Sequence, residues 1–227
     1  MNPKDIYEEI SSLLKKEENN SSILKNEKAN GKKWSYSICA TPITLSKPLI
    51  IGINWGGGGP KDNYDYSFPE DIPTKEKFLH ELKCGEYKFL SKSKEYIFEN
   101  LSLDIYSDDF NYSNLCFFRT PNLQYLKGED FEISIPIFKK FVNYLQPSWI
   151  LSLGNTNITY LEKFLNIPDE MSLKPIHLNG KRIGKFEVTG YIGTLLSKQF
   201  YCLPHPGAHI HKIDRDEIWK TVFPGKS

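Results

Sequence analysis

Short apolar runs alternate with amphipathic stretches along most of this chain. Four of the runs have the continuous apolar character of strands that are buried on both faces of a parallel sheet. They cover residues 47–54, 115–118, 149–154 and 199–203. Each run is short and is bounded by polar, Gly or Pro positions, which favours strands over buried helices.

Apolar positions at helical spacing predict helices at about 92–101, 134–145 and 155–164, the second with Pro136 in its first turn. Asn2-Pro3 predicts the start of a first helix, and Asp214, with Glu217 three residues later, predicts the start of a final one. Residues 185–192 add an antiparallel hairpin. The alternation predicts an α/β fold, a three-layer α/β/α sandwich around a central, mainly parallel four-stranded sheet.

The length and composition favour one compact domain. The chain has 227 residues, 39% of them apolar, which suffices for a single core. We expect residues 1–33 to form an N-terminal helix and a polar arm, and residues 34–227 to form the α/β domain. No apolar leader follows Met1 and no run reaches transmembrane length, so we expect a cytoplasmic protein with no membrane partner. We also expect a monomer.

Charge and cysteine content exclude some classes of function. Lys and Arg together number 29 against 28 acidic residues, whereas a non-specific nucleic-acid coat protein is far more basic. Any DNA contact must therefore come from a local patch. The four cysteines lie far apart without a C-x-x-C pair, which favours buried thiols over a zinc or iron–sulfur site (Cys39, Cys84, Cys116, Cys202).

Three predicted strands end in unusual segments, at residues 54–60, 119–122 and 205–209. Ligands of open α/β sheets bind beyond the carboxyl ends of the strands, so we expect these segments to meet at one edge. The glycine run at 56–59 can cradle a phosphate with bare N–H groups or form a flexible surface loop, but no Gly-Lys-Ser/Thr follows it. The candidate site lies at this edge.

His205 lies between Pro204 and Pro206, which fix the backbone on both sides of its imidazole. A histidine held rigidly at a strand end is a candidate catalytic group. His209 and His211 complete an H-x-x-x-H-x-H pattern, so a zinc site is the alternative.

Four segments carry a family resemblance. Gly52-Ile53-Asn54-Trp55-Gly56 resembles the first motif of uracil-DNA glycosylases, especially the Gly-Ile-Asn-Pro-Gly form of the mismatch-specific and thymine-DNA branch. His205-Pro206-Gly207 resembles the second motif, usually His-Pro-Ser or Asn-Pro-Ser. Ser113-Asn114-Leu115 with Arg119-Thr120-Pro121 is similar to the middle strand of that branch, and Leu151-Ser152-Leu153-Gly154 to a Leu-Gly strand end. Their order and separation agree over about residues 47–222.

The resemblance implies a monofunctional DNA glycosylase. Such an enzyme hydrolyses the N-glycosidic bond of a flipped uracil-like or modified base, in base excision repair or in defence against modified DNA, without a cofactor or metal. Asn54 would hold a water near the anomeric carbon, and His205 would donate a hydrogen bond to the carbonyl oxygen of the departing base. The most active members carry Asp at the first position, so Asn54 implies a slower enzyme.

The resemblance also implies contacts to the base and to the DNA. Asn114 would recognise the base edge, although an Asn before a strand also suits a turn. Phe68, or next Tyr66, would stack on the flipped base, and Ile53 and Trp55 would line its pocket. The expected DNA contacts include a wedge at His209 or Ile210; together they are Gly56, Gly57, Arg119, Gly207, His209, Ile210 and Lys212.

Two positions depart from the family pattern. Trp55 stands where the first motif has Pro, and Gly207 stands where the second has Ser, so the identity of the base stays open. Two other functions compete with the glycosylase. One is a catalytically silent protein that binds nucleic acid or a nucleobase in the same cleft. The other is a metal-dependent hydrolase centred on His205, His209 and His211.

Overall fold

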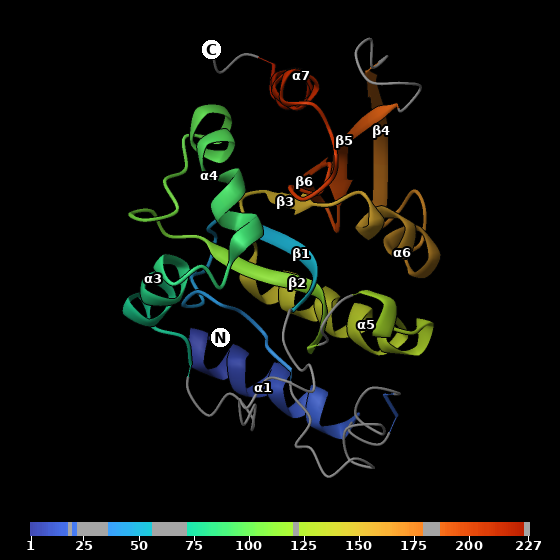
Figure 1. The fold of residues 1–227 in the computed structure, drawn as a ribbon. Coiled ribbons are helices and arrows are strands. Elements are labelled where there is room, and N and C mark those ends of the chain that lie inside the picture. Colours follow the sequence, from blue (N-terminus) through green and yellow to red (C-terminus); the bar gives the residue numbers. More distant parts are fainter. Residues whose placement is uncertain (18–19, 22–35, 56–71, 120–122, 179–186, 225–227) are drawn as a thin grey trace.

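A six-stranded mixed sheet forms the centre of the protein (Figure 1). The computed structural model describes residues 1–17, 20–21, 36–55, 72–119, 123–178 and 187–224. Within them the strand order is β2-β1-β3-β6-β5-β4. The strands are β1 (Leu49–Trp55), β2 (Asn111–Arg119), β3 (Ile150–Leu153), β4 (Met171–Leu178), β5 (Val188–Leu195) and β6 (Lys198–Leu203).

The four predicted strands are all present and form the parallel part of the sheet. β1 pairs with β2 and β3, and β3 pairs with β6, in each case in parallel. The prediction of four strands is wrong in number, because β5 and β4 extend the sheet with antiparallel pairing. Both strands are partly exposed and therefore lack a continuous apolar run. Residues 188–192 of the hairpin expected at 185–192 lie within the single strand β5, which forms its antiparallel pairs with β4 and with β6.

Six α-helices accompany the sheet in the described part of the chain. They are α1 (Pro3–Lys16), α3 (Lys75–Lys83), α4 (Lys88–Leu101), α5 (Gly128–Leu145), α6 (Thr156–Phe164) and α7 (Lys212–Val222). Asn2 caps α1 by accepting a hydrogen bond from the Asp5 amide, which confirms the predicted start. α5 begins at Gly128, so Pro136 lies inside the helix and not in its first turn. α7 begins at Lys212 with His211 as its N-cap, earlier than predicted.

Helices cover both faces of the sheet, and each face has its own apolar core. On one face α1, α5 and α6 pack against strand residues such as Ile51 and Phe117. On the other face α3, α4 and α7 pack against residues such as Ile50 and Leu203. The buried Ile6, Ile10 and Leu14 make α1 part of the first core.

All four cysteines are free thiols. Cys39, Cys116 and Cys202 are buried as expected, whereas Cys84, at the end of α3, is exposed. None of the helices within the described segments is both long and apolar enough to cross a membrane.

Candidate functional site

The two candidate catalytic residues project from the same edge of the sheet. Ile51 on β1, Ser152 on β3 and Cys202 on β6 are paired across the sheet and lie at one level. Asn54 lies three residues beyond this level, and so does His205. Neighbouring strands are about 4.8 Å apart, so the backbones of β1 and β6, on either side of β3, are separated by about 10 Å. The fold therefore brings together the ends of the two motifs.

Asn114 lies on β2, which pairs with β1 on the side opposite to β3. It pairs with Gly52 in register and is only 2% exposed. A Cβ atom on Gly52 would overlap with Asn114 Oδ1, so the Asn114 amide occupies the space above that glycine. Asn114 is inside β2, so the alternative that it forms a turn before the strand is wrong.

The Asn114 amide is buried but open to a ligand. No hydrogen bond to it is formed within the described part of the chain. Buried amides are normally hydrogen-bonded, because leaving one unpaired costs free energy. A side chain with one acceptor and two donors in this position can recognise the polar edge of a nucleobase.

The His205 imidazole is held by contacts on several sides. It is half-buried, and its ring centroid lies 4.1 Å from that of Phe89 in an edge-to-face arrangement. A Cβ atom on Gly154, at the end of β3, would lie 3.6 Å from His205 Cδ2, so the imidazole rests against the bare backbone there. Gly154 also has a φ of +139°, which favours glycine.

One hydrogen bond fixes the tautomer of His205. The Gly207 N–H donates to His205 Nδ1 over 3.1 Å. Because Nδ1 accepts, the proton of the neutral imidazole lies on Nε2. Nε2–H is therefore the group that His205 can donate to a ligand.

The surroundings of His205 favour its neutral form. Burial lowers the pKa of His205 below its ordinary value of 6.5, and the positive charges of Arg215 and Lys92 lower the pKa further. Arg215 also binds the turn that carries His205, donating to the Ala208 carbonyl over 2.9 Å and to the His205 carbonyl over 3.4 Å. A neutral imidazole with an Nε2 proton can stabilise an anion that forms beside it.

Gly207 packs tightly in this turn. A Cβ atom there would lie 3.2 Å from His205 Cε1 and 3.2 Å from Phe89 Cε1, closer than most side chains tolerate. Gly207 therefore lies directly beside the imidazole.

Trp55 and Ile53 point into the two cores. The register of β1 shifts between Asn54 and Trp55, a bulge that re-aims the strand end. Trp55 is 6% exposed and packs edge-on against Tyr112, with ring centroids 5.9 Å apart. Ile53 packs against the core of α1 and α5. Asn54 Nδ2 donates to the Trp55 carbonyl over 3.0 Å, so the bulge also orients the candidate catalytic amide.

The predicted DNA contacts lie at two places. Arg119 ends β2 and donates to Ser37 Oγ over 3.0 Å. His209, Ile210 and Lys212 follow His205, with His209 and Lys212 exposed and Ile210 packed partly against the core of α3, α4 and α7. Gly56, Gly57, Tyr66 and Phe68 lie outside the described residues.

The arrangement of the described residues does not support the alternative of a three-histidine metal centre. No three His, Cys, Asp or Glu side chains in the described segments are placed to hold a metal ion together. His205 Nδ1 and His211 Nδ1 each accept a backbone N–H, from Gly207 and Ile213. These two histidines organise the turn and the start of α7.

Three residues near the site were not predicted. Phe89 and Arg215 contact His205 or its turn only because α4 and α7 pack together. Asn157 on α6 is buried and donates to the Gly52 carbonyl over 3.2 Å and to Ser152 Oγ over 2.7 Å, which joins the ends of β1 and β3. Of these three, only Asn157 could have been identified from the sequence, because it belongs to the polar Asn-Thr-Asn segment that directly follows the Leu-Gly strand end.

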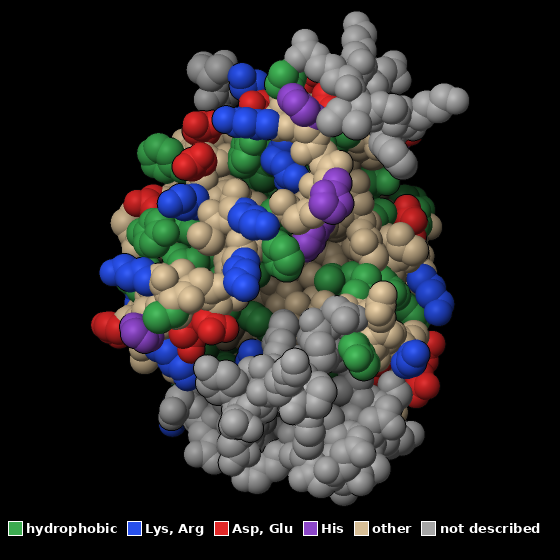
Figure 2. All heavy atoms as spheres, viewed as in Figure 1, with side chains coloured by type: hydrophobic (Ala, Val, Ile, Leu, Met, Phe, Trp, Pro, Cys, Tyr) green, Lys and Arg blue, Asp and Glu red, His purple; other side chains and the backbone are tan. Residues whose placement is uncertain are grey.

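The site has a local positive charge although the whole chain is nearly neutral. Figure 2 shows Lys and Arg side chains beside histidines on the face that carries α4 and α7. Lys92 and Arg215 are close enough to His205 to lower its pKa, and Lys212 begins α7. This is the kind of patch that a DNA contact requires.

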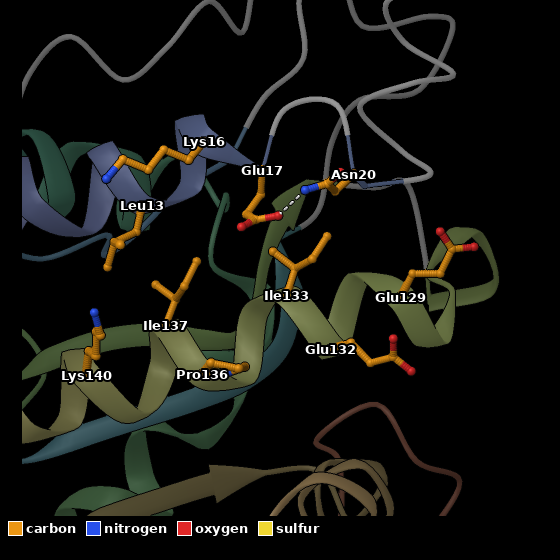
Figure 3. A pocket seen from close by; sticks show the side chains of 10 residues that line it. All are labelled: Leu13, Lys16, Glu17, Asn20, Glu129, Glu132, Ile133, Pro136, Ile137 and Lys140. Carbon is orange, nitrogen blue, oxygen red and sulfur yellow. Dashed lines mark hydrogen bonds between the residues drawn. The ribbon is translucent and has the colours of Figure 1, made fainter.

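A separate cavity of about 460 Å³ lies between α1 and α5 (Figure 3). Leu13 and Lys16 of α1 face Ile133, Ile137 and Lys140 of α5 across it. These helices cover the face of the sheet opposite to α4 and α7, so the cavity is not part of the candidate site.

No known family model matches this chain, and no curated protein matches its sequence.

Proposed function

We propose that this protein is a DNA glycosylase that hydrolyses the N-glycosidic bond of a flipped-out base. The observation that carries the proposal is the placement of Asn54 and His205 at one edge of the sheet, with the buried Asn114 beside Gly52 on the neighbouring strand. Helices on both faces of the sheet agree with the three-layer sandwich that the alternation of strands and helices predicts. The base would be uracil-like or modified.

His205 would stabilise the leaving group. As the bond between C1′ and the base breaks, the sugar becomes oxocarbenium-like and the base gains negative charge on a carbonyl oxygen. The His205 Nε2–H donates to that oxygen, and the neutral imidazole loses no proton in doing so. Asn114 supplies a donor and an acceptor to the edge of the same base.

Asn54 would position the water. The water oxygen bonds to C1′ while the base departs with the electron pair of the broken bond. An amide does not act as a general base near neutral pH, so the water proton passes to solvent after attack. This division of roles agrees with a slow enzyme that depends mainly on leaving-group stabilisation.

A panel of labelled oligonucleotides tests the proposal. It contains uracil, thymine mismatches, hypoxanthine, and hydroxymethylated or glycosylated pyrimidines, each single- and double-stranded. We expect one class to lose its free base and to break on alkaline treatment, and we expect both Asn54→Ala and His205→Ala to lose that activity. Saturable binding without any abasic product would identify a silent binding protein instead. Full activity in both variants would contradict the assigned chemistry.

The pH profile of this activity depends on Arg215. Because Arg215 lowers the pKa of His205, Arg215→Gln should raise that pKa toward 6.5. Protonation puts a proton on Nδ1, which can then no longer accept the hydrogen bond from the Gly207 N–H, so the turn that orients Nε2–H is disturbed as the pH falls through the pKa of His205. The acid limb of kcat/KM should therefore move to higher pH in the variant. Lys92→Gln should move it less, since Lys92 is the weaker of the two charges. Arg215→Lys keeps the charge and is the control; an unmoved limb in Arg215→Gln would contradict the assignment of this limb to His205.

A further inference from the structure

Phe89 is an exposed aromatic side chain beside the candidate catalytic histidine. It is the second residue of α4 and is 43% exposed, although it contacts the imidazole of His205. Burial of an aromatic ring is strongly favourable, so exposure of this size leaves apolar surface that a ligand can cover. Asn114 is only 2% exposed, whereas Phe89 lies beside His205 at the solvent-exposed rim.

The Phe89 ring lies on a rigid support. Gly207 lies close against its Cε1 atom, on the side of the His205 turn. Tyr96, two turns further along α4, stacks on Trp219 of α7 with ring centroids 5.3 Å apart and donates a hydrogen bond to Asp216 over 2.6 Å. α4 is thereby fixed to α7, and Phe89 needs little reorganisation to accept a stacking partner.

The charge around Phe89 indicates the chemistry of that partner. Lys92 lies one turn further along α4, and Lys92 and Arg215 both place positive charge near His205. An aromatic platform next to cations is the arrangement that binds single-stranded nucleic acid, with bases on the ring and phosphates on the cations.

We propose that Phe89 stacks on an unpaired base next to the target nucleotide, and that the substrate is therefore single-stranded or locally unpaired DNA. This inference rests on the proposed function, because it places the target base between Asn114 and His205. A flanking base at the rim reaches Phe89 only if it leaves its own stack, which is least costly in a single strand.

Helix α4 provides a matched control. Phe98 is also exposed, at 59%, and lies on the same helix. It is nine residues after Phe89, about half a turn around the helix and about 13 Å along its axis. A Phe98→Ala variant therefore removes the same side chain from the same helix without touching the site.

The experiment measures binding to an oligonucleotide that carries a tetrahydrofuran abasic analogue, so the identity of the base is not needed. We expect the wild-type protein to bind the single strand more tightly than the duplex. Phe89→Ala should weaken single-strand binding about 5- to 150-fold, the range expected for loss of one base–aromatic stack, and should reduce the preference over duplex. Phe89→Trp should keep both properties, and Phe98→Ala should leave them unchanged.

Several outcomes would overturn the inference. Equal affinities of Phe89→Ala and Phe98→Ala exclude stacking. An equal loss on single strand and duplex shows that Phe89 only supports His205. The results distinguish failure of this inference from failure of the proposed function. If the protein excises a base but Phe89→Ala binds DNA as the wild type does, only the inference about Phe89 is contradicted. If binding depends on Phe89 but no base is excised, only the proposed catalysis is contradicted. A wild-type protein that binds neither strand form overturns both.

Discussion

Replacement of His205 by alanine is expected to lower the rate of base excision by about 100- to 1,000-fold, the usual cost of removing one donor to a developing anion. The loss should fall on kcat and not on KM, because the base oxygen carries its negative charge only in the transition state. Single-turnover kinetics on the active oligonucleotide of the panel measure this directly.

Two further variants make the His205 result specific. His205→Asn keeps an N–H donor near the same position and should recover part of the lost rate. His177→Ala, which removes an exposed histidine from β4 at the far edge of the sheet, should retain nearly the full rate. A similar loss in His177→Ala would show that the rate does not depend specifically on the Nε2 proton of His205.

Continuous apolar runs made the parallel half of the sheet predictable. β2 and β3 are buried almost throughout, and β1 and β6 bury at least half of their residues, so burial is visible in the sequence itself. β4 and β5 are partly exposed, and their pairing depends on each other more than on the core. The nine-residue α3 buries only Phe78 and Leu82, too few positions for a helical period to stand out.

The residues of the candidate site were likewise predictable only where local features of the sequence identify them. Asn54 and His205 could be predicted because strand ends and flanking prolines are local features of the sequence. Phe89 and Arg215 could not, because they reach the site only through the packing of α4 and α7. Gly52 belongs to the first motif in the sequence, but the reason for a glycine there is visible only in the structure, where Asn114 Oδ1 occupies the space that a Cβ atom would fill.

That contact predicts the effect of Gly52→Ala. The added Cβ atom meets Asn114 Oδ1, so the variant should lose about 1–3 kcal/mol of the free energy of unfolding, as overpacked cores do. The displaced Asn114 amide should also weaken base recognition. Denaturant unfolding gives the stability, and Gly128→Ala is the control, since a Cβ there meets only Lys163 Nζ at 3.6 Å.

A double-mutant cycle that combines Gly52→Ala with Asn114→Ala tests whether the contact with Asn114 causes the loss of stability. In the Asn114→Ala background the amide oxygen is gone, and alanine loses less backbone entropy than glycine in a strand. Gly52→Ala should then be neutral or slightly stabilising, which gives a large interaction energy in the double-mutant cycle. If Gly52→Ala lowers the free energy of unfolding equally in both backgrounds, the loss is not caused by the contact with Asn114. Glycine in the first motif would then need another explanation. With the expected result, residue 52 must be glycine because only a bare backbone leaves room for the Asn114 amide, the group that we propose contacts the base.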